Sequence, residues 1–156
     1  MRIAVFAVGT RMPGWVATGV DAYRKRLPRQ IKLDIVEISP GHRSGHGPVE
    51  AAMRKEEEQL LKRAERADRV IALDERGVEW TSVQLADQMR TWRQDAAGVA
   101  LLIGGPDGLT DACRQRADAA WSLSRLTLPH GLVRVVLAEQ IYRAWTILQG
   151  HPYHRE

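Results

Sequence analysis

The sequence contains only one cysteine, Cys113, and it has no long hydrophobic run. A single thiol excludes an internal disulfide and a zinc site built from cysteines, so we expect Cys113 to be a small core residue. The longest apolar stretches, such as Val99 to Ile103, are far shorter than the roughly 18 residues that a membrane-spanning helix needs. We therefore expect no membrane partner.

The sequence also lacks the signatures of several enzyme classes. It has no H-E-x-x-H zinc helix and no nucleophile elbow around a serine. His42 and His46 have helical spacing, but they lie in a loop rich in glycine and proline with no acidic ligand nearby. We therefore expect no metal site.

The first nine residues, MRIAVFAVG, are weakly similar to a signal peptide because one arginine precedes a short apolar run. A signal peptide needs a longer apolar region and a small-residue cleavage site, whereas Thr10, Arg11 and Met12 follow here. We interpret this segment as a first strand and expect a cytoplasmic protein.

Positive charge is in excess, and the excess lies in the first third of the chain. Residues 1–48 contain 8 Lys/Arg and 3 Asp/Glu (+5), whereas residues 49–156 contain 15 and 16 (−1), which gives the net charge of +4. A localised basic surface suits a polyanion such as RNA, although a charge run is more often only a solvated helix face. The prominent cations are Arg24, Lys25, Arg26, Arg29, Lys32 and Arg43.

Strand-like apolar stretches alternate with helical periodicity along the whole chain. This alternation predicts one α/β domain, residues 1–156, with a mostly parallel sheet and helices on both faces. The segment 99–103 is the most apolar and is predicted to be a central strand, and residues 40–48 predict a flexible surface loop. The expected strands are Arg2 to Val8, Ile31 to Ile38, Arg69 to Leu73, Val99 to Ile103 and one within Trp121 to Thr127, and the expected helices are Pro13 to Leu27, Val49 to Ala67, Ser82 to Arg93, Thr110 to Ala119 and Leu132 to Leu148.

Three predicted strand ends are candidates for a binding site, because ligands collect at the carboxyl ends of parallel strands. They are residues 73–75, the turn GGPDG at 104–108, and SLSRLTLPH at 122–130. The turn has neither the Lys-Ser/Thr pair of a P-loop nor the G-x-G-x-x-G of a dinucleotide site, and a glycine-rich turn is more often structural. Asp107 and Asp111 would repel phosphate and favour a ligand that is neutral or cationic nearby.

Two segments have more than one interpretation. SLSRLTLPH is apolar, lacks negative charge and ends beside a proline, so it suits an edge strand or, alternatively, a flat slot for an adenine ring. The terminal HPYHRE, residues 151–156, concentrates two histidines, a tyrosine, an arginine and a glutamate. Termini are usually frayed, but a tail needed only for solubility has no use for groups that donate, accept, stack or shuttle protons.

Four phrases, in this order, resemble the ribosomal RNA large subunit methyltransferase H family within the SPOUT class. They are AVGTRMPGWV, LLIGGPDGL, WSLSRLTLPHGLVRVVLAEQIYRAW and HPYHRE, and the resemblance runs from residue 1 to 156. The chain departs from the expected pattern mainly at residues 40–48, which are rich in glycine and histidine where more lysine is expected. This departure bears on whether the loop at 40–48 contributes to RNA contact, and not on the activity.

The resemblance implies a SPOUT α/β fold with a C-terminal trefoil knot, and a homodimer that holds S-adenosylmethionine in the knot. It implies methylation of N3 of a pseudouridine in large-subunit (23S) ribosomal RNA, with the assembled ribosome as substrate and the RNA reaching the site across the dimer interface. The cofactor residues implied are Leu73, Gly104 and Gly105, with the knot loop formed by Leu123, Ser124, Arg125, Leu126, Thr127 and Leu128.

An imide N–H is a weak nucleophile until its proton leaves, so the implied reaction needs alignment and a base or a cation that stabilises the developing anion. An arginine could hold phosphate or stabilise the anion, a tyrosine could stack on a base, and a histidine could accept the proton; which does which stays open. The candidates are Tyr153, His154 and Arg155 in the tail, Glu139 and Arg143 on the last helix, and His130 beside the knot loop.

Two other functions are compatible with parts of the sequence. A non-catalytic RNA- or ribosome-binding module would explain the charge asymmetry equally well, but not the cofactor phrases and the polar tail. An enzyme of the NAD-binding Rossmann type is disfavoured by the missing fingerprint. A titration with S-adenosylmethionine would separate these alternatives.

Overall fold

The computed structural model describes residues 1–95 and 98–155. Their strands form one five-stranded parallel sheet in the order β2-β1-β4-β3-β5. The strands are β1 (Arg2–Val8), β2 (Lys32–Ile38), β3 (Arg69–Glu79), β4 (Gly98–Ile103) and β5 (Ala119–Ser122). The helices are α1 (Gly14–Arg24), α2 (Glu50–Ala64), α3 (Ser82–Asp95), α4 (Asp111–Arg116) and α5 (His130–Gln149).

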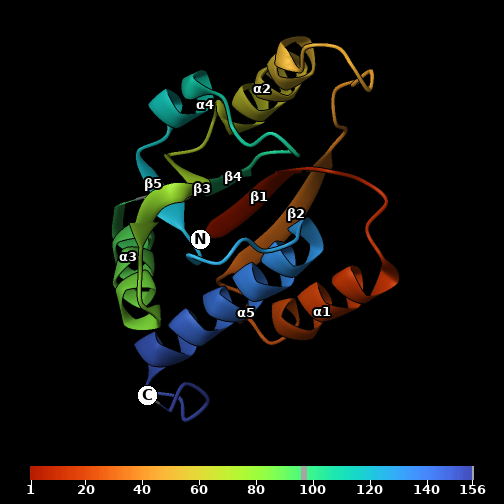
Figure 1. Ribbon diagram of the computed structural model, residues 1–156. Helices are drawn as coiled ribbons and strands as arrows, with labels where there is room; N and C mark the ends of the chain where they lie inside the picture. Colours follow the sequence, from red (N-terminus) through yellow and green to blue (C-terminus); the bar gives the residue numbers. More distant parts are fainter. Residues whose placement is uncertain (96–97, 156) are drawn as a thin grey trace.

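Helices cover both faces of the sheet, as the alternation predicted (Figure 1). Successive side chains of a strand point to opposite faces, so β1 places Ile3 and Val5 in one core and Phe6 and Val8 in the other. The first core is closed by α1, α3 and α5, and the second by α2 and α4. The α/β class with helices on both faces is confirmed.

Strand β4 lies in the middle of the sheet, between β1 and β3, and its residues from Val99 to Ile103 are all buried. A strand with helices on both sides has no polar face, which explains its continuous apolar run. The predicted central position is confirmed. Cys113, buried against the α2 side of the sheet, is the small core residue that was expected.

Two predicted strand boundaries were wrong. Strand β3 continues to Glu79 instead of ending at Leu73, because residues 74–77 bulge outward: both Leu73 and Val78 pair with Trp121. The strand expected within 121–127 is the short β5, which begins at Ala119, because the preceding helix ends at Arg116 and not at Ala119 as expected. It ends at Ser122, where the chain leaves the sheet.

Helix α5 is the longest element, with 20 residues that extend about 30 Å at 1.5 Å per residue. It starts after Pro129, which suits the first turn, and it ends at Gly150, whose left-handed φ of 66° favours glycine. Figure 1 shows that the C-terminus lies at the far end of this helix from the loop that follows β5. No helix in the described ranges is both long and apolar enough to cross a membrane.

Candidate functional site

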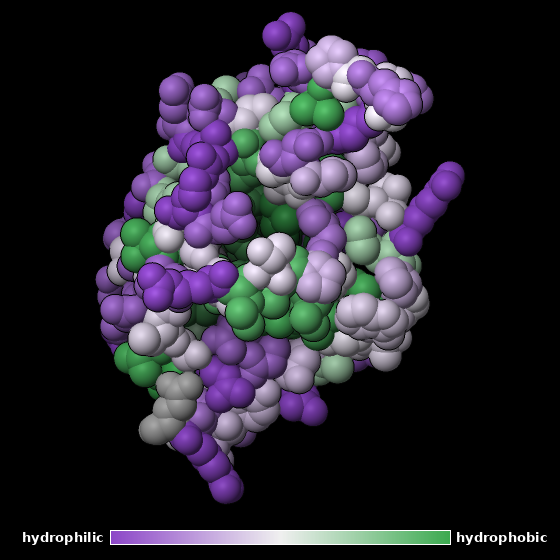
Figure 2. Space-filling view, in the orientation of Figure 1, coloured by the Kyte–Doolittle hydropathy of each residue, from purple (hydrophilic) through white to green (hydrophobic). Residues whose placement is uncertain are grey.

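A cavity of about 470 Å³ opens at the carboxyl ends of the three neighbouring strands β4, β3 and β5. Leu73, Ile103 and Trp121 lie at the same level across these strands, because Leu73 pairs with both of the others. Figure 2 shows the hollow near the centre of the view, with hydrophobic side chains in its depth and along its lower rim. The three strand ends expected to form a site therefore meet in one cavity.

Eight of the nine residues expected around the cofactor line this cavity, and Arg125 does not. The Arg125 side chain is 90% exposed and points to Glu79, 3.3 Å away. The eight lining residues are Leu73, Gly104, Gly105, Leu123, Ser124, Leu126, Thr127 and Leu128.

The glycine-rich turn after β4 forms one wall of the cavity. The turn closes on itself, because the Gly108 N–H donates to the Gly105 carbonyl over 3.0 Å. A side chain at Gly104 would not fit, since its Cβ would lie 2.4 Å from the Gly108 carbonyl carbon. Gly108 has a φ of +80°, which side chains rarely adopt. The glycines are thus required by close backbone approach at 104 and by conformation at 108.

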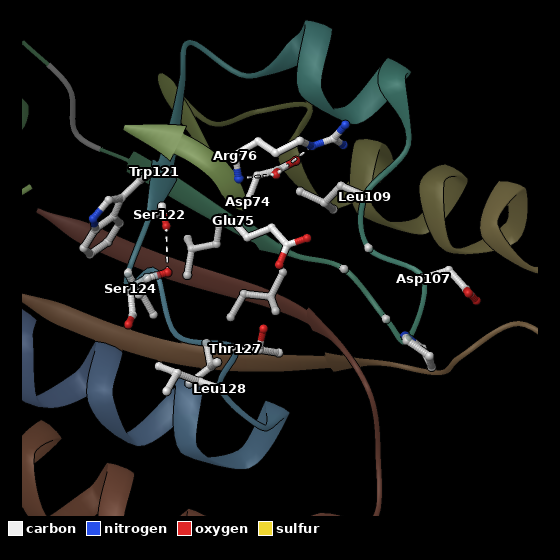
Figure 3. A pocket seen from close by; sticks show the side chains of 18 of the residues that line it. Asp74, Glu75, Arg76, Asp107, Leu109, Trp121, Ser122, Ser124, Thr127 and Leu128 are labelled. Carbon is white, nitrogen blue, oxygen red and sulfur yellow. Dashed lines mark hydrogen bonds and ion pairs between the residues drawn. The ribbon is translucent and has the colours of Figure 1, made fainter. Parts of the chain in front are cut away.

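The loop after β5 forms the opposite wall and is held by its two serines (Figure 3). The Ser122 hydroxyl donates to the Ser124 carbonyl over 3.1 Å, and the Ser124 hydroxyl accepts from the Leu126 N–H over 2.9 Å. The Leu126 side chain is left 74% exposed. The loop therefore presents apolar side chains on a constrained backbone, and the adenine slot stays a prediction.

Sequence reasoning placed Asp74 and Glu75 at a candidate strand end, but it missed Arg76 in the bulge of β3 and Arg114 in α4, which also line the cavity. Asp74 accepts from the Arg76 N–H over 2.9 Å and from Arg114 Nη1 over 3.3 Å. Burial opposes ionisation of Asp74, but these donors outweigh it and lower the pKa of the carboxyl. Gly77 was the available signal, because glycine inside a strand often marks a bulge; its Cβ would lie 2.6 Å from the Ala120 carbonyl carbon.

The charge argument from Asp107 and Asp111 is not supported by the structure. Arg43 Nε donates to Asp107 over 2.9 Å, and Arg114 pairs with Asp111, so both carboxylates are neutralised locally. Figure 3 shows the Asp107 side chain pointing away from the cavity, whereas Glu75 reaches toward its centre. Neither aspartate alone therefore determines the charge of a ligand.

His130 lies behind the cavity wall at the first residue of α5. Its Nε2 is 2.5 Å from the Gly104 carbonyl oxygen. A carbonyl only accepts, so Nε2 carries the hydrogen and donates. Its Nδ1 is buried and has no hydrogen-bond partner among residues 1–95 and 98–155. The structure thus connects this candidate to the backbone of the glycine-rich turn.

Four other candidates form a cluster farther along α5, which we call the tail cluster: Glu139, Arg143, Tyr153 and His154. Glu139 accepts from the Tyr153 hydroxyl over 3.0 Å and from Arg143 Nε over 2.9 Å. Arg143 also donates to the His154 carbonyl over 3.3 Å and lies 5.1 Å from the centre of the Tyr153 ring. Burial, reinforced by the hydrogen bond to Glu139, raises the pKa of Tyr153 to about 12. Tyr153 is therefore a hydrogen-bond donor at neutral pH.

The tail cluster and the cavity are separate within one chain. Glu139 follows His130 by nine residues, about 14 Å along the helix. Tyr153 folds back onto this same stretch, where its ring packs 4.7 Å from that of Tyr142. Arg155 is exposed, and Glu156 lies outside the described residues.

The basic surface of the first third is smaller than predicted, because Arg43 does not belong to it. Its guanidinium binds Glu56 and Asp107, and its side chain is only 19% exposed. The other prominent cations are exposed and lie at the end of α1 and the start of β2, on the sheet edge opposite to the cavity. Arg26 lies 5.7 Å from the centre of the Tyr142 ring, which connects this surface to the tail cluster. The remaining basic residues are Arg24, Lys25, Arg26, Arg29 and Lys32.

Comparison with known proteins identifies the class to which this architecture corresponds. The family model described as "Predicted SPOUT methyltransferase" matches residues 1–154. The ribosomal RNA large subunit methyltransferase H of Hahella chejuensis is 54% identical over 156 residues and covers 100% of both chains. The protein of the same name from Marinomonas sp. is 53% identical over 155 residues, which are 99% of this chain and 100% of that one.

Solved structures share the fold at low sequence identity. A methylase family protein from Haemophilus influenzae Rd KW20 is similar with a TM-score of 0.61 and 11% identity, over 97% of this chain and 69% of that one. A methyltransferase from Legionella pneumophila, solved in complex with the bound cofactor SAM, gives a TM-score of 0.52 and 12% identity over 93% and 66%. Within the described residues, no group of three or more His, Cys, Asp or Glu side chains is arranged to hold a metal ion.

Proposed function

The chain belongs to the SPOUT methyltransferase family, and on this premise we propose that it transfers a methyl group from S-adenosylmethionine to large-subunit ribosomal RNA. The observation that carries the proposal is the meeting of the three predicted strand ends in one cavity. The finer proposal is that the acceptor is N3 of a pseudouridine in 23S ribosomal RNA of the assembled ribosome. The cytoplasm, where ribosomes act, is then the place of the reaction.

The cavity suits the proposed cofactor in size and lining. Its volume of about 470 Å³ lies within the roughly 300–1,000 Å³ usual for small-molecule sites. Leu73, Leu126 and Leu128 offer apolar contacts, and the turn at 104–108 brings backbone close to a ligand without intervening side chains. The inward Glu75 offers a carboxylate to polar or cationic groups.

When bound, S-adenosylmethionine supplies a methyl group made electrophilic by its sulfonium. The residues of this chain must bring an imide nitrogen into line with that methyl group and manage its proton. We assign to Arg143 the stabilisation of the developing imide anion, and to Glu139 the orientation of Arg143 through its 2.9 Å hydrogen bond. Tyr153 contributes its hydroxyl as a donor, His154 is the candidate proton acceptor and Arg155 the candidate phosphate contact.

The proposed site needs two copies of the chain. The tail cluster lies about 14 Å along α5 from the residue that contacts the glycine-rich turn, so it does not reach its own cavity. Exposed apolar side chains at the starts of α1 and α5 and in the loop after β5, namely Trp15, Leu126 and Leu132, provide a surface for a partner. We infer a homodimer in which the tail cluster of one subunit completes the cavity of the other, with RNA held by the basic residues 24–32. The trefoil knot stays a prediction, and residues 1–156 are proposed to act as one domain.

The decisive experiment supplies labelled S-adenosylmethionine and compares assembled ribosomes that lack the modification with free 23S ribosomal RNA. We expect label on one nucleotide of the large-subunit RNA, and we expect more label on assembled ribosomes than on free 23S ribosomal RNA. Label only on other RNAs, or none although the cofactor binds, would contradict the rRNA assignment. Binding without any transfer would favour the non-catalytic binding module.

Mixing two inactive variants tests the composite site. One variant carries Gly104→Val in the cavity, and the other lacks residues 151–156. If subunits exchange freely, half of the dimers contain one variant of each kind, and each of these has one intact site, which restores about a quarter of the wild-type activity. Absence of recovery in a mixture shown to contain mixed dimers would contradict a site shared between subunits.

A further inference from the structure

The loop between β2 and α2 contacts the glycine-rich turn of the cavity through one side chain, Arg43. Its Nε donates to Asp107 Oδ2 over 2.9 Å. Its two terminal nitrogens donate to the carboxylate of Glu56 over 2.6 and 3.2 Å, and Nη1 also donates to the Gly41 carbonyl over 3.1 Å. The guanidinium therefore bridges α2, its own loop and the turn.

Glu56 makes this bridge firm, because its side chain is only 4% exposed. It also accepts from the Gly41 N–H over 2.9 Å, so both carboxylate oxygens have donors. Its hydrogen bonds to Arg43 raise the pKa of the guanidinium, which is charged at every working pH. A Cβ at Gly105 would lie 3.1 Å from Glu56 Oε1, so the carboxylate also lies directly against the turn.

A second contact from α2 holds the far end of the same turn. The Thr110 hydroxyl donates to Glu57 Oε1 over 2.5 Å, and it accepts from the Cys113 N–H as the cap of α4. Successive glutamates of α2 thus fix the segment 107–110 at two points, one directly and one through Arg43. This arrangement gives the loop at 40–48, interpreted from sequence as flexible surface, a role inside the molecule.

We propose that Arg43 is a positioning residue for the cofactor: by joining Asp107 to the buried Glu56, it holds the glycine-rich turn in its binding conformation. The inference rests on the proposed binding of S-adenosylmethionine in the cavity. Glycine-rich backbone loses much conformational entropy when it becomes ordered. A turn that is already ordered before the cofactor binds therefore lowers the free-energy cost of binding. Because its guanidinium is occupied by two carboxylates, Arg43 is not a phosphate contact for the RNA.

The test measures the dissociation constant of S-adenosylmethionine by calorimetry in the full-length dimer. Arg43→Lys keeps the charge but cannot span both carboxylates, and Asp107→Ala removes the acceptor that connects the guanidinium to the turn while leaving the buried pair with Glu56 intact. We expect each variant to weaken cofactor binding by about five- to tenfold, the low end of the coupling usual between sites. Arg54→Ala, which removes an exposed arginine from α2, is the matched control and is expected to change the constant less than twofold.

The double variant decides whether Arg43 acts through Asp107, since Asp107 itself lines the cavity. Arg43→Lys is expected to have less than a twofold effect when Asp107 is already replaced by alanine. An equal effect of Arg43→Lys in both backgrounds would overturn the inference. It would also be overturned if folded Arg43→Lys had a lowered unfolding temperature but an unchanged dissociation constant, because that result is the signature of a merely structural role. If the wild-type chain itself binds no S-adenosylmethionine, it is the proposed function that fails.

Discussion

The two ends of α5 serve the site in different ways. At its start, His130 supports the backbone of a cavity built from strand ends, glycines and apolar side chains. From its middle onward, the helix and the tail that folds back on it concentrate charged and hydrogen-bonding groups around Glu139. The first region is suited to holding a small molecule and the second to acting on a substrate, so their separation along one helix favours a site completed between subunits.

The largest effect is expected from Gly104→Val, which should destroy the cavity near the start of α5 and leave the tail cluster intact. The new Cβ would lie 2.4 Å from the Gly108 carbonyl carbon, a backbone atom that cannot move without displacing the turn. We expect cofactor affinity to fall by about a hundredfold or more, measured by calorimetry. Gly45→Ala is the matched control, because nothing lies within 4 Å of a Cβ there, and it should bind normally.

Glu139→Gln should affect the tail cluster and leave the cavity unchanged. The change keeps the shape of the side chain but removes the charge that holds Arg143 and accepts from Tyr153. We expect kcat to fall by about ten- to a hundredfold, with cofactor affinity within about twofold of wild type. Glu58→Gln, on the exposed side of α2, serves as the control. A parallel loss of cofactor binding would mean that the two regions are not functionally distinct.

Tyr153→Phe tests the packing of the tail cluster through the pH dependence of the unfolding free energy. The pKa of Tyr153 is raised to about 12 in the folded chain, above the usual value of 10.0, so the tyrosine stabilises the fold fully below pH 10. This contribution is lost as the pH rises from 10 to 12. We expect the wild-type minus variant difference in unfolding free energy to be constant from pH 7 to 9 and to shrink above 10. In an ultraviolet titration, the tyrosinate signal missing from the variant should have its midpoint near 12, and a midpoint near 10 would refute the packing of Tyr153 on Glu139.

The smallest effect is expected from Arg125→Ala. This arginine lies in the loop that forms the cavity wall, but its side chain is 90% exposed and directed toward Glu79. We therefore expect cofactor affinity to change less than about twofold, because exposed ion pairs contribute little. A larger loss in the calorimetric titration would show that Arg125 turns inward when the cofactor binds.

The sequence was informative where a local pattern has one structural outcome. The apolar run 99–103 predicted a strand covered on both faces, and it lies at the centre of the sheet. Gly104 and Gly108 indicated a special turn, because close approach and positive φ are properties of a backbone without a Cβ. These features depend on a residue and its neighbours in the chain.

The sequence failed where the outcome depends on partners distant in the chain. Arg43 was interpreted as part of a basic surface, because nothing local shows that Glu56 and Asp107 meet its guanidinium. Gly77 indicated a bulge near 74–77, but its extent is defined by the pairing of β3 with a strand more than forty residues later. Pairing decides whether a charge is free and where a strand ends, and pairing is a property of the folded chain.

By itself, then, the sequence determined the α/β class, the order of the elements and the three segments that carry the cavity, because periodicity and glycine positions are local. Only the tertiary structure decided that these segments meet, that Arg43 faces inward, and that the tail cluster lies away from its own cavity. The physical reason is that hydrophobic periodicity specifies which face of an element is buried, whereas charges and hydrogen bonds are assigned only when those buried faces pack together.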